Sequence, residues 1–217
     1  MKIFIDFDDV LFDTRNFRAD FQNIFSQFGI ADDIYTRNYY NYPPNNQNFP
    51  ETIYILEEHL KKIGKIISFD EIALKRKIQN LLKDTRKYVF SDVESLLQNF
   101  SRKELFLISH GDPNFQKKKI NNSGISHFFG VVKISRIFKS QEIKKIINKS
   151  DCSRKKEKYL FLDDRVHYIE EVKKCLPEII TILIKRPEGR YWDQKNCYCN
   201  FTAKNLKKAL RIIKGNK

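Results

Sequence analysis

Residues 2–14 read KIFIDFDDVLFDT, an apolar run that turns acidic as it ends. Four carboxylates, Asp6, Asp8, Asp9 and Asp13, fall within eight residues. Clustered like charges repel, and a buried carboxylate is costly unless a cation or hydrogen-bond donors compensate it. These side chains therefore either face water or surround a positive charge.

Five short apolar runs predict the buried strands of a parallel sheet. They are residues 2–7, 104–109, 129–135, 158–164 and 179–186. Amphipathic patterns typical of helices lie between them, at residues 91–100, 114–122, 140–149 and 166–175, the third with Ser140 as its N-cap. This alternation favours right-handed βαβ units and hence an α/β fold built on a doubly wound, Rossmann-like parallel sheet.

One long stretch, residues 15–87, interrupts the alternation and is too long for a loop. Helical patterns occupy residues 15–28, 51–63 and 68–84 of this stretch. A polar, aromatic loop is expected at residues 36–50. The third pattern opens with a capping box from Ser68 to Glu71. We therefore expect a helical cap, residues 15–87, inserted after the first strand of a core domain formed by residues 1–14 and 88–217.

Composition indicates a cytoplasmic protein with a substantial core and no membrane partner. Hydrophobic residues make up 41% of the 217, yet no apolar run approaches the roughly 18–20 residues that span a bilayer. Acidic residues appear by position 6, which is unlike a signal peptide. The four cysteines, at 152, 175, 197 and 199, lack zinc-site spacing, so reduced thiols are expected.

Positive charge is concentrated in the second half of the chain. Residues 1–132 hold 18 Lys and Arg against 17 Asp and Glu, whereas residues 133–217 hold 23 against 10. Such a surface attracts polyanions or phosphorylated substrates. The lysines recur around amphipathic helices instead of forming one stripe, which favours a small phosphorylated substrate over nucleic acid as the partner. Stacking of bases on Tyr39, Tyr40 and Tyr42 remains open.

Polar side chains collect where the predicted strands end. In open parallel sheets ligands bind at that edge. The strand ends, together with the start of the helix after the third strand, carry Asp6, Asp8, Ser109, His110, Lys139, Asp163 and Asp164. Carboxylates and phosphate oxygens are ligands for Mg²⁺, a carboxylate can attack phosphorus, and a second can transfer the proton. Hydroxyl and ammonium groups stabilise the transferring oxygens. The sequence therefore predicts Mg²⁺-dependent phosphoryl transfer.

These residues resemble the four motifs of the haloacid dehalogenase (HAD) superfamily. The first motif is a strand ending DxD, here DFDDVL at 6–11, and LFLIS at 105–109 matches the second. Lys139 matches the lysine of the third motif, and YLFLDD at 159–164 the acidic fourth. Many members carry Gly where this chain has Asp9. The insertion after the first motif resembles the helical cap of the C1 subgroup.

The resemblance implies a role for each matching position. Asp6 would be the nucleophile and a metal ligand, and Asp8 the general acid/base, with its backbone carbonyl on the metal. Asp164 would bind Mg²⁺ directly and Asp163 through the outer sphere. Ser109 and Lys139 would hold the transferring phosphoryl group, with His110 as a further candidate. The implied enzyme is a phosphatase that forms an aspartyl-phosphate on a small metabolite or nucleotide.

Several alternatives remain open on the sequence. Lys133 is a second candidate for the third-motif lysine, and Asp163-Asp164 could cap the following helix. Lys185, Arg186 and Arg190 could grip an anionic substrate or could simply tie the tail to the core. A phosphomutase, a nucleic-acid-end phosphatase and a non-catalytic binding protein are alternative functions. Dehalogenases attack carbon and need no acid two residues after the nucleophile, so Asp8 disfavours them.

Overall fold

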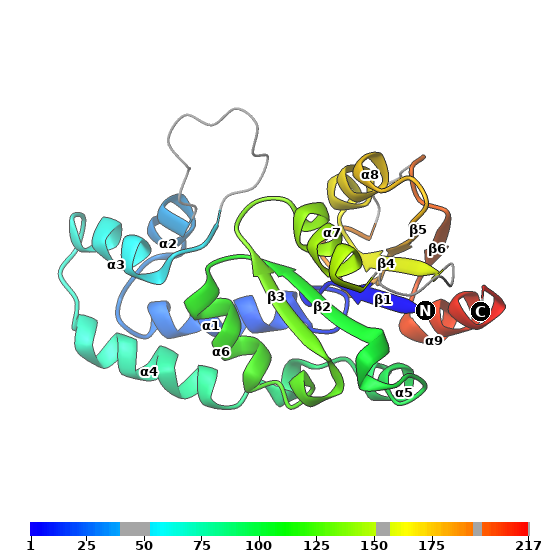
Figure 1. Cartoon of the computed structure of the whole chain (residues 1–217). Helices are drawn as coiled ribbons and strands as arrows, with labels where there is room; N and C mark the ends of the chain where they lie inside the picture. The colour runs from blue at the N-terminus through cyan, green and yellow to red at the C-terminus, as the bar shows by residue number, and fades with distance from the viewer. Residues whose placement is uncertain (40–52, 151–156, 193–196, 217) are drawn as a thin grey trace.

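The computed structural model describes residues 1–39, 53–150, 157–192 and 197–216 (Figure 1). Within these residues six parallel strands form one sheet in the order β3-β2-β1-β4-β5-β6. Their bounds are β1 (Lys2–Ile5), β2 (Leu105–His110), β3 (Val131–Ser135), β4 (Tyr159–Asp163), β5 (Ile180–Ile184) and β6 (Phe201–Ala203). The predicted α/β fold with a doubly wound parallel sheet is confirmed. The sixth strand was not predicted, because it has three residues and two of them are exposed.

Alternating side chains of the strands build two apolar layers, one on each face of the sheet. On β1, Ile3 and Ile5 join one layer while Phe4 joins the other, and all three are fully buried. Phe4 pairs in register with Phe106 on one side and with Phe161 on the other. The central strand is thus anchored on both faces, which fixes where its carboxyl end delivers Asp6.

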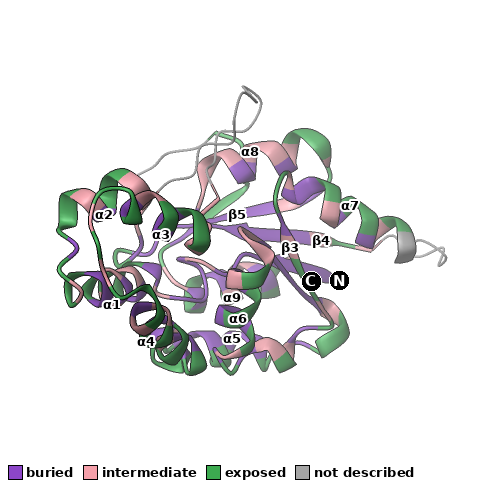
Figure 2. Cartoon of the chain, turned by 90° about the vertical axis from the view of Figure 1, so that its left-hand side faces the viewer, coloured by how far each residue is buried: buried purple, intermediate pink, exposed green. Residues whose placement is uncertain are grey.

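Helices cover both faces of the sheet (Figures 1 and 2). The layer that contains Phe4 is closed by α7 (Lys139–Ser150) and α8 (Val166–Cys175). The opposite layer is closed by α5 (Val93–Leu97), α6 (Pro113–Asn121) and α9 (Leu206–Gly215). Figure 2 shows β4 and β5 as buried ribbons between these helices. None of the described helices has the length and apolar character needed to cross a membrane.

Four helices follow β1 in the chain, before α5, and lie beside the sheet and away from both termini in Figure 1. They are α1 (Thr14–Ser26), α2 (Asp32–Tyr39), α3 (Leu56–Gly64) and α4 (Glu71–Lys83). Phe17, Phe21 and Phe25 on α1 are buried in the same apolar cluster as Phe7 and Phe12, which follow β1. The core therefore continues from the sheet into the inserted helices without a break.

Three local predictions were wrong: two helix caps and the start of one loop. Asp70, and not Ser68, caps α4, since its carboxylate accepts from the Ala73 amide. Helix α7 begins at Lys139, so Ser140 lies in its first turn and its amide donates to Glu171.

The third concerns the predicted loop at 36–50. Its residues 36–39 belong to α2, and the remainder lies outside the described residues, as do Tyr40, Tyr42 and Cys152. Among the described residues, Cys175, Cys197 and Cys199 form no disulfide.

Candidate active site

Three buried carboxylates meet at the carboxyl ends of the two central strands. Asp6 directly follows β1, and its amide donates to the Leu162 carbonyl, which continues the β1–β4 ladder for one more residue. Asp163 is the last residue of β4, and Asp164 follows it. One oxygen from each of these three carboxylates lies within 4.8 Å of the others. The parallel register of adjacent strands therefore assembles the cluster.

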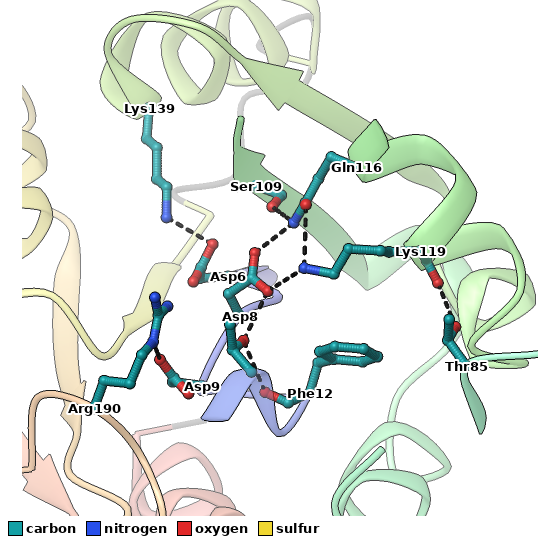
Figure 3. A network of polar contacts seen from close by, with 11 residues as sticks. Asp6, Asp8, Asp9, Phe12, Thr85, Ser109, Gln116, Lys119, Lys139 and Arg190 are labelled. Carbon is teal, nitrogen blue, oxygen red and sulfur yellow. Dashed lines mark hydrogen bonds and ion pairs between the residues drawn. The ribbon is translucent and has the colours of Figure 1, made fainter. Parts of the chain in front are cut away.

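Lys139 supplies one positive charge to this cluster (Figure 3). Its Nζ atom lies 2.7 Å from Asp6 Oδ1 and 2.6 Å from Asp163 Oδ2, and its side chain is 1% exposed. Burial alone lowers the pKa of Lys139, but the charges of Asp163 and Asp6 outweigh it and the net shift is upward. Lys133, the alternative candidate, is exposed on the edge strand β3.

One ammonium does not balance three carboxylates. Burial raises the pKa of Asp6 to about 8, and Lys139 offsets this only in part. Burial and the charges of Asp9 and Asp163 raise the pKa of Asp164 well above its usual value. The Asp164 Oδ2 atom is buried without a hydrogen-bond partner. A hard divalent cation would satisfy that oxygen and neutralise the cluster, so the residues fit Mg²⁺.

Asp8 lies apart from the cluster, in a separate polar pocket (Figure 3). Its carboxylate accepts hydrogen bonds from Thr14 Oγ1 at 2.8 Å, Lys119 Nζ at 2.6 Å and Gln116 Nε2 at 2.5 Å. Burial would raise the pKa of Asp8, but the charges of Lys119 and Arg190 outweigh it and lower the pKa to about 2. The two carboxylates of the DxD motif thus have opposite environments.

Gln116 and Lys119 on α6 are site residues that the sequence did not single out. The Gln116 amide also donates to Ser109 Oγ at 2.8 Å, so it links Ser109 to Asp8. Lys119 is 4% exposed, and its Nζ lies 4.9 Å from the Phe12 ring centroid and 5.0 Å from that of Phe17. The sequence feature that could have indicated them is their spacing of three residues, which places both side chains on one face of the helix.

Asp9 lies beside Asp8 and forms an ion pair with Arg190. Asp9 has a positive φ of 57°, a conformation that favours glycine, and its carboxylate accepts from Arg190 Nε at 2.6 Å. Arg186 points elsewhere, since it is buried and donates to Asp92 and to the Val10 carbonyl. Of the two roles that the sequence leaves open for Lys185, Arg186 and Arg190, Arg186 therefore has the structural one, because it ties the segment after β5 to the core.

A cavity of about 250 Å³ opens at this edge of the sheet. It is lined by Asp8, Thr14, Phe17, Arg18, Tyr39, Ile53, Tyr54, His110, Gly111, Asp112, Phe115, Gln116, Lys119, Arg165, Arg190 and Tyr191. One wall thus comes from the core, including His110 beside Ser109, and another from the inserted helices. A small ligand in this cavity would contact both.

Comparisons with known proteins agree on the fold. No protein-family model and no curated protein matches the chain. Among solved structures, YfnB of Bacillus subtilis, described as a HAD-hydrolase bound to magnesium, gives a TM-score of 0.64 at 15% identity, over 98% of this chain and 98% of its own. A haloacid dehalogenase-like hydrolase from Burkholderia xenovorans gives 0.67 at 17% identity, over 98% and 96%.

A third similar structure carries a different chemistry in its name. L-2-haloacid dehalogenase from Xanthobacter autotrophicus gives a TM-score of 0.59 at 15% identity, over 99% of this chain and 98% of its own. All three neighbours match nearly the full length of the chain, so the sheet and the inserted helices are both included. The chain therefore has the fold of the haloacid dehalogenase-like hydrolases.

Proposed function

We propose that this chain is a HAD-superfamily phosphatase that hydrolyses a small phosphomonoester with Mg²⁺. The observation that carries the proposal is the separation of the two DxD carboxylates. Asp6 lies in the three-carboxylate cluster, whereas Asp8 faces the cavity with donors of its own. A nucleophile beside a cation and a separate proton-transfer group are the two functions that hydrolysis through an aspartyl-phosphate requires.

In this proposal Asp6 attacks phosphorus, and the bond to the leaving oxygen breaks. Asp8 gives that oxygen a proton and later takes one from the water that hydrolyses the aspartyl-phosphate. The low pKa of Asp8 describes the substrate-free protein. A bound phosphate places negative charge near Asp8, which raises its pKa and favours the protonated acid.

The remaining residues position the phosphoryl group. Ser109 and Lys139 would donate to the oxygens on which charge accumulates. Asp6, Asp163, Asp164 and the Asp8 backbone carbonyl are the candidate ligands for Mg²⁺, which when bound would neutralise the carboxylates and the phosphate. We also propose that residues 15–87 act as a cap, because α1 and α2 supply Arg18 and Tyr39 to the cavity wall.

Dehalogenation is the competing chemistry on this fold. A halide leaves carbon as a stable anion and needs no proton from the enzyme, so a dehalogenase has no use for a second carboxylate at Asp8. Here Asp8 is held by three side chains that face the cavity edge. Three donors that hold this carboxylate at the cavity favour a leaving group that needs a proton, which is an oxygen and not a halide.

The two chemistries are separated by one assay of purified protein. We expect release of inorganic phosphate from an aryl phosphate with Mg²⁺, loss of turnover in EDTA, and recovery when Mg²⁺ is restored. Halide release from a 2-haloacid is measured in parallel. Phosphate release that is indifferent to EDTA, or halide release without phosphate release, would contradict the proposal.

A further inference from the structure

Gln116 on α6 joins two groups of the reaction centre through a single nitrogen (Figure 3). Its Nε2 atom lies 2.8 Å from Ser109 Oγ and 2.5 Å from Asp8 Oδ2. Gln116 is 4% exposed and Ser109 is fully buried, so water competes little for these hydrogen bonds. An amide nitrogen carries two hydrogens, and this bridge uses both of them.

The orientation of the Gln116 amide is set by Lys119, three residues further along α6. Lys119 Nζ lies 3.3 Å from Gln116 Oε1, and an ammonium group can only donate. On the other side of the amide, the Asp8 carboxylate can only accept. The amide oxygen therefore faces Lys119, and the NH₂ group faces Asp8 and Ser109. Lys119 is itself held in place, because its Nζ atom also donates to Asp8 Oδ1 at 2.6 Å.

The bridge decides where the Ser109 hydroxyl can point. Because Ser109 Oγ accepts from Gln116, its own proton must be directed away from the amide. None of the residues that the structure describes accepts that proton. Ser109 lies near the carboxyl end of β2, and β2 pairs with β1, which Asp6 directly follows. The hydroxyl is thus able to donate to an oxygen of the phosphoryl group that Asp6 would attack.

The same bridge holds one particular oxygen of Asp8. The Oδ1 atom accepts from both Thr14 and Lys119, which occupies its two lone pairs. The Oδ2 atom accepts from Gln116 alone among the described residues, so one of its lone pairs stays available. Oδ2 is therefore the oxygen that would carry the proton for the leaving group, and Gln116 fixes its position.

We propose that Gln116 is a positioning residue that aligns Ser109 and Asp8 with each other. Its NH₂ group directs the Ser109 proton toward the phosphoryl oxygens, and it holds Asp8 Oδ2 for transfer of a proton to the leaving oxygen. Gln116 itself forms and breaks no covalent bond. This inference rests on the proposed phosphatase function and adds the residue that links its two parts, phosphoryl binding and proton transfer.

The test removes the NH₂ group and asks whether the effect depends on Ser109. Gln116→Met keeps the length of the side chain without its hydrogen bonds. Gln116→Glu keeps an acceptor for Lys119 and loses only the donor, so it decides the question if the methionine variant does not fold. The rate is measured as kcat/KM for an aryl phosphate, which reports the phosphorylation step. We expect either substitution to lower it by roughly 10- to 100-fold, as for loss of a hydrogen bond to a charged group.

Dependence on the Ser109 hydroxyl separates positioning from a purely structural role. In a Ser109→Ala background no hydroxyl is left to direct, so the same Gln116 substitution should cost less than about threefold, close to the usual limit of additivity. A Ser109→Thr background keeps a hydroxyl and should restore the full loss. Gln98→Met is the matched control, since Gln98 is an exposed glutamine after α5 that donates to Glu94. It should keep the wild-type rate.

Failure of this inference is distinguishable from failure of the phosphatase proposal. Equal losses in the wild-type and Ser109→Ala backgrounds overturn the role of Gln116 and leave the phosphatase proposal standing. If no ester is hydrolysed, calorimetric binding of inorganic phosphate still decides. Phosphate binding that the Gln116 substitution weakens only when the Ser109 hydroxyl is present supports the inference. Phosphate binding that is equal in wild type and variant, or absent from both, overturns it.

Discussion

Lys139 Nζ lies 2.7 Å from Asp6 Oδ1, although the two residues are 133 positions apart in the chain. The same nitrogen lies 2.6 Å from Asp163, so one buried ammonium holds the ends of β1 and β4 together. This ion pair joins the first, third and fourth predicted motifs in one place. It also places the proposed nucleophile beside a donor for the transferring oxygens.

Loss of this ammonium should be costly to the fold. Lys139→Met leaves Asp6 and Asp163 buried without their cation, and breaking a buried pair in this way typically costs about 3–5 kcal/mol. We expect the free energy of unfolding in urea to fall by that amount. Lys133→Met is the matched control, because Lys133 is exposed on β3, and it should change stability little. Equal, small effects of the two substitutions would contradict the assignment.

Asp8→Asn tests proton transfer separately from nucleophilic attack. The asparagine oxygen can still accept from Thr14 and Lys119, but its nitrogen cannot accept from Gln116 and has no acidic proton to donate. We expect kcat to fall by roughly 10²–10⁴ on alkyl phosphates, the usual contribution of a general acid or base. The loss should be smaller in the phosphorylation step for aryl phosphates, whose leaving group needs less help. Asp33→Asn, at an exposed pair, should have no effect. If the rate of the phosphorylation step fell equally for alkyl and aryl phosphates, the result would argue against Asp8 as the general acid.

The buried His59 makes the inserted helices sensitive to acid. Burial lowers its pKa from 6.5 to about 4, and the hydrogen bond to the Tyr35 carbonyl offsets this in part. Between these values the unfolded chain binds a proton and the folded chain does not, so stability is present above pH 6.5 and is lost as pH falls toward 4. The loss amounts to at most about 3 kcal/mol, at 1.36 kcal/mol per pKa unit.

Thermal unfolding of His59→Gln between pH 7 and 4 measures this effect. A glutamine can accept from Tyr54 and donate to the Tyr35 carbonyl, yet it does not titrate in this range. The variant should therefore lose less stability than wild type on acidification. His127→Gln, at an exposed histidine, should follow the wild type. A wild-type pH slope in His59→Gln would show that another group governs the acid response.

The strands and the cluster at their ends could be predicted because both follow from local pattern. Continuous apolar runs predict β1 to β5. Because parallel strands end at the same edge of the sheet, the sequence also predicts that Asp6 and Asp163 lie close together. The strand β6 has no such pattern. Its Phe201 is exposed, and the strand forms only because β5 offers an unpaired edge.

The donors around Asp8 depend on tertiary contacts that no local pattern contains. The run at 117–119 offers three consecutive lysines, of which Lys117 and Lys118 are exposed and only Lys119 is buried against Asp8. Helical phase indicates that Lys119 shares a face with Gln116, but not which carboxylate it meets 111 residues away. Likewise, the pairing of Asp9 with Arg190 requires knowing that the segment after β5 returns to the first motif.

The central claim is that Asp6 carries the phosphoryl group during turnover, and acid quenching tests it most directly. Protein with the Asp8→Asn substitution, which should hydrolyse the intermediate slowly, is mixed with Mg²⁺ and an aryl phosphate, quenched in acid and mapped by mass spectrometry. We predict an acid-stable, hydroxylamine-sensitive phosphoryl group on Asp6, absent from the Asp6→Asn/Asp8→Asn double variant. Continued phosphate release by the Asp6→Asn variant, or a phosphoryl group on any other residue, would contradict the account.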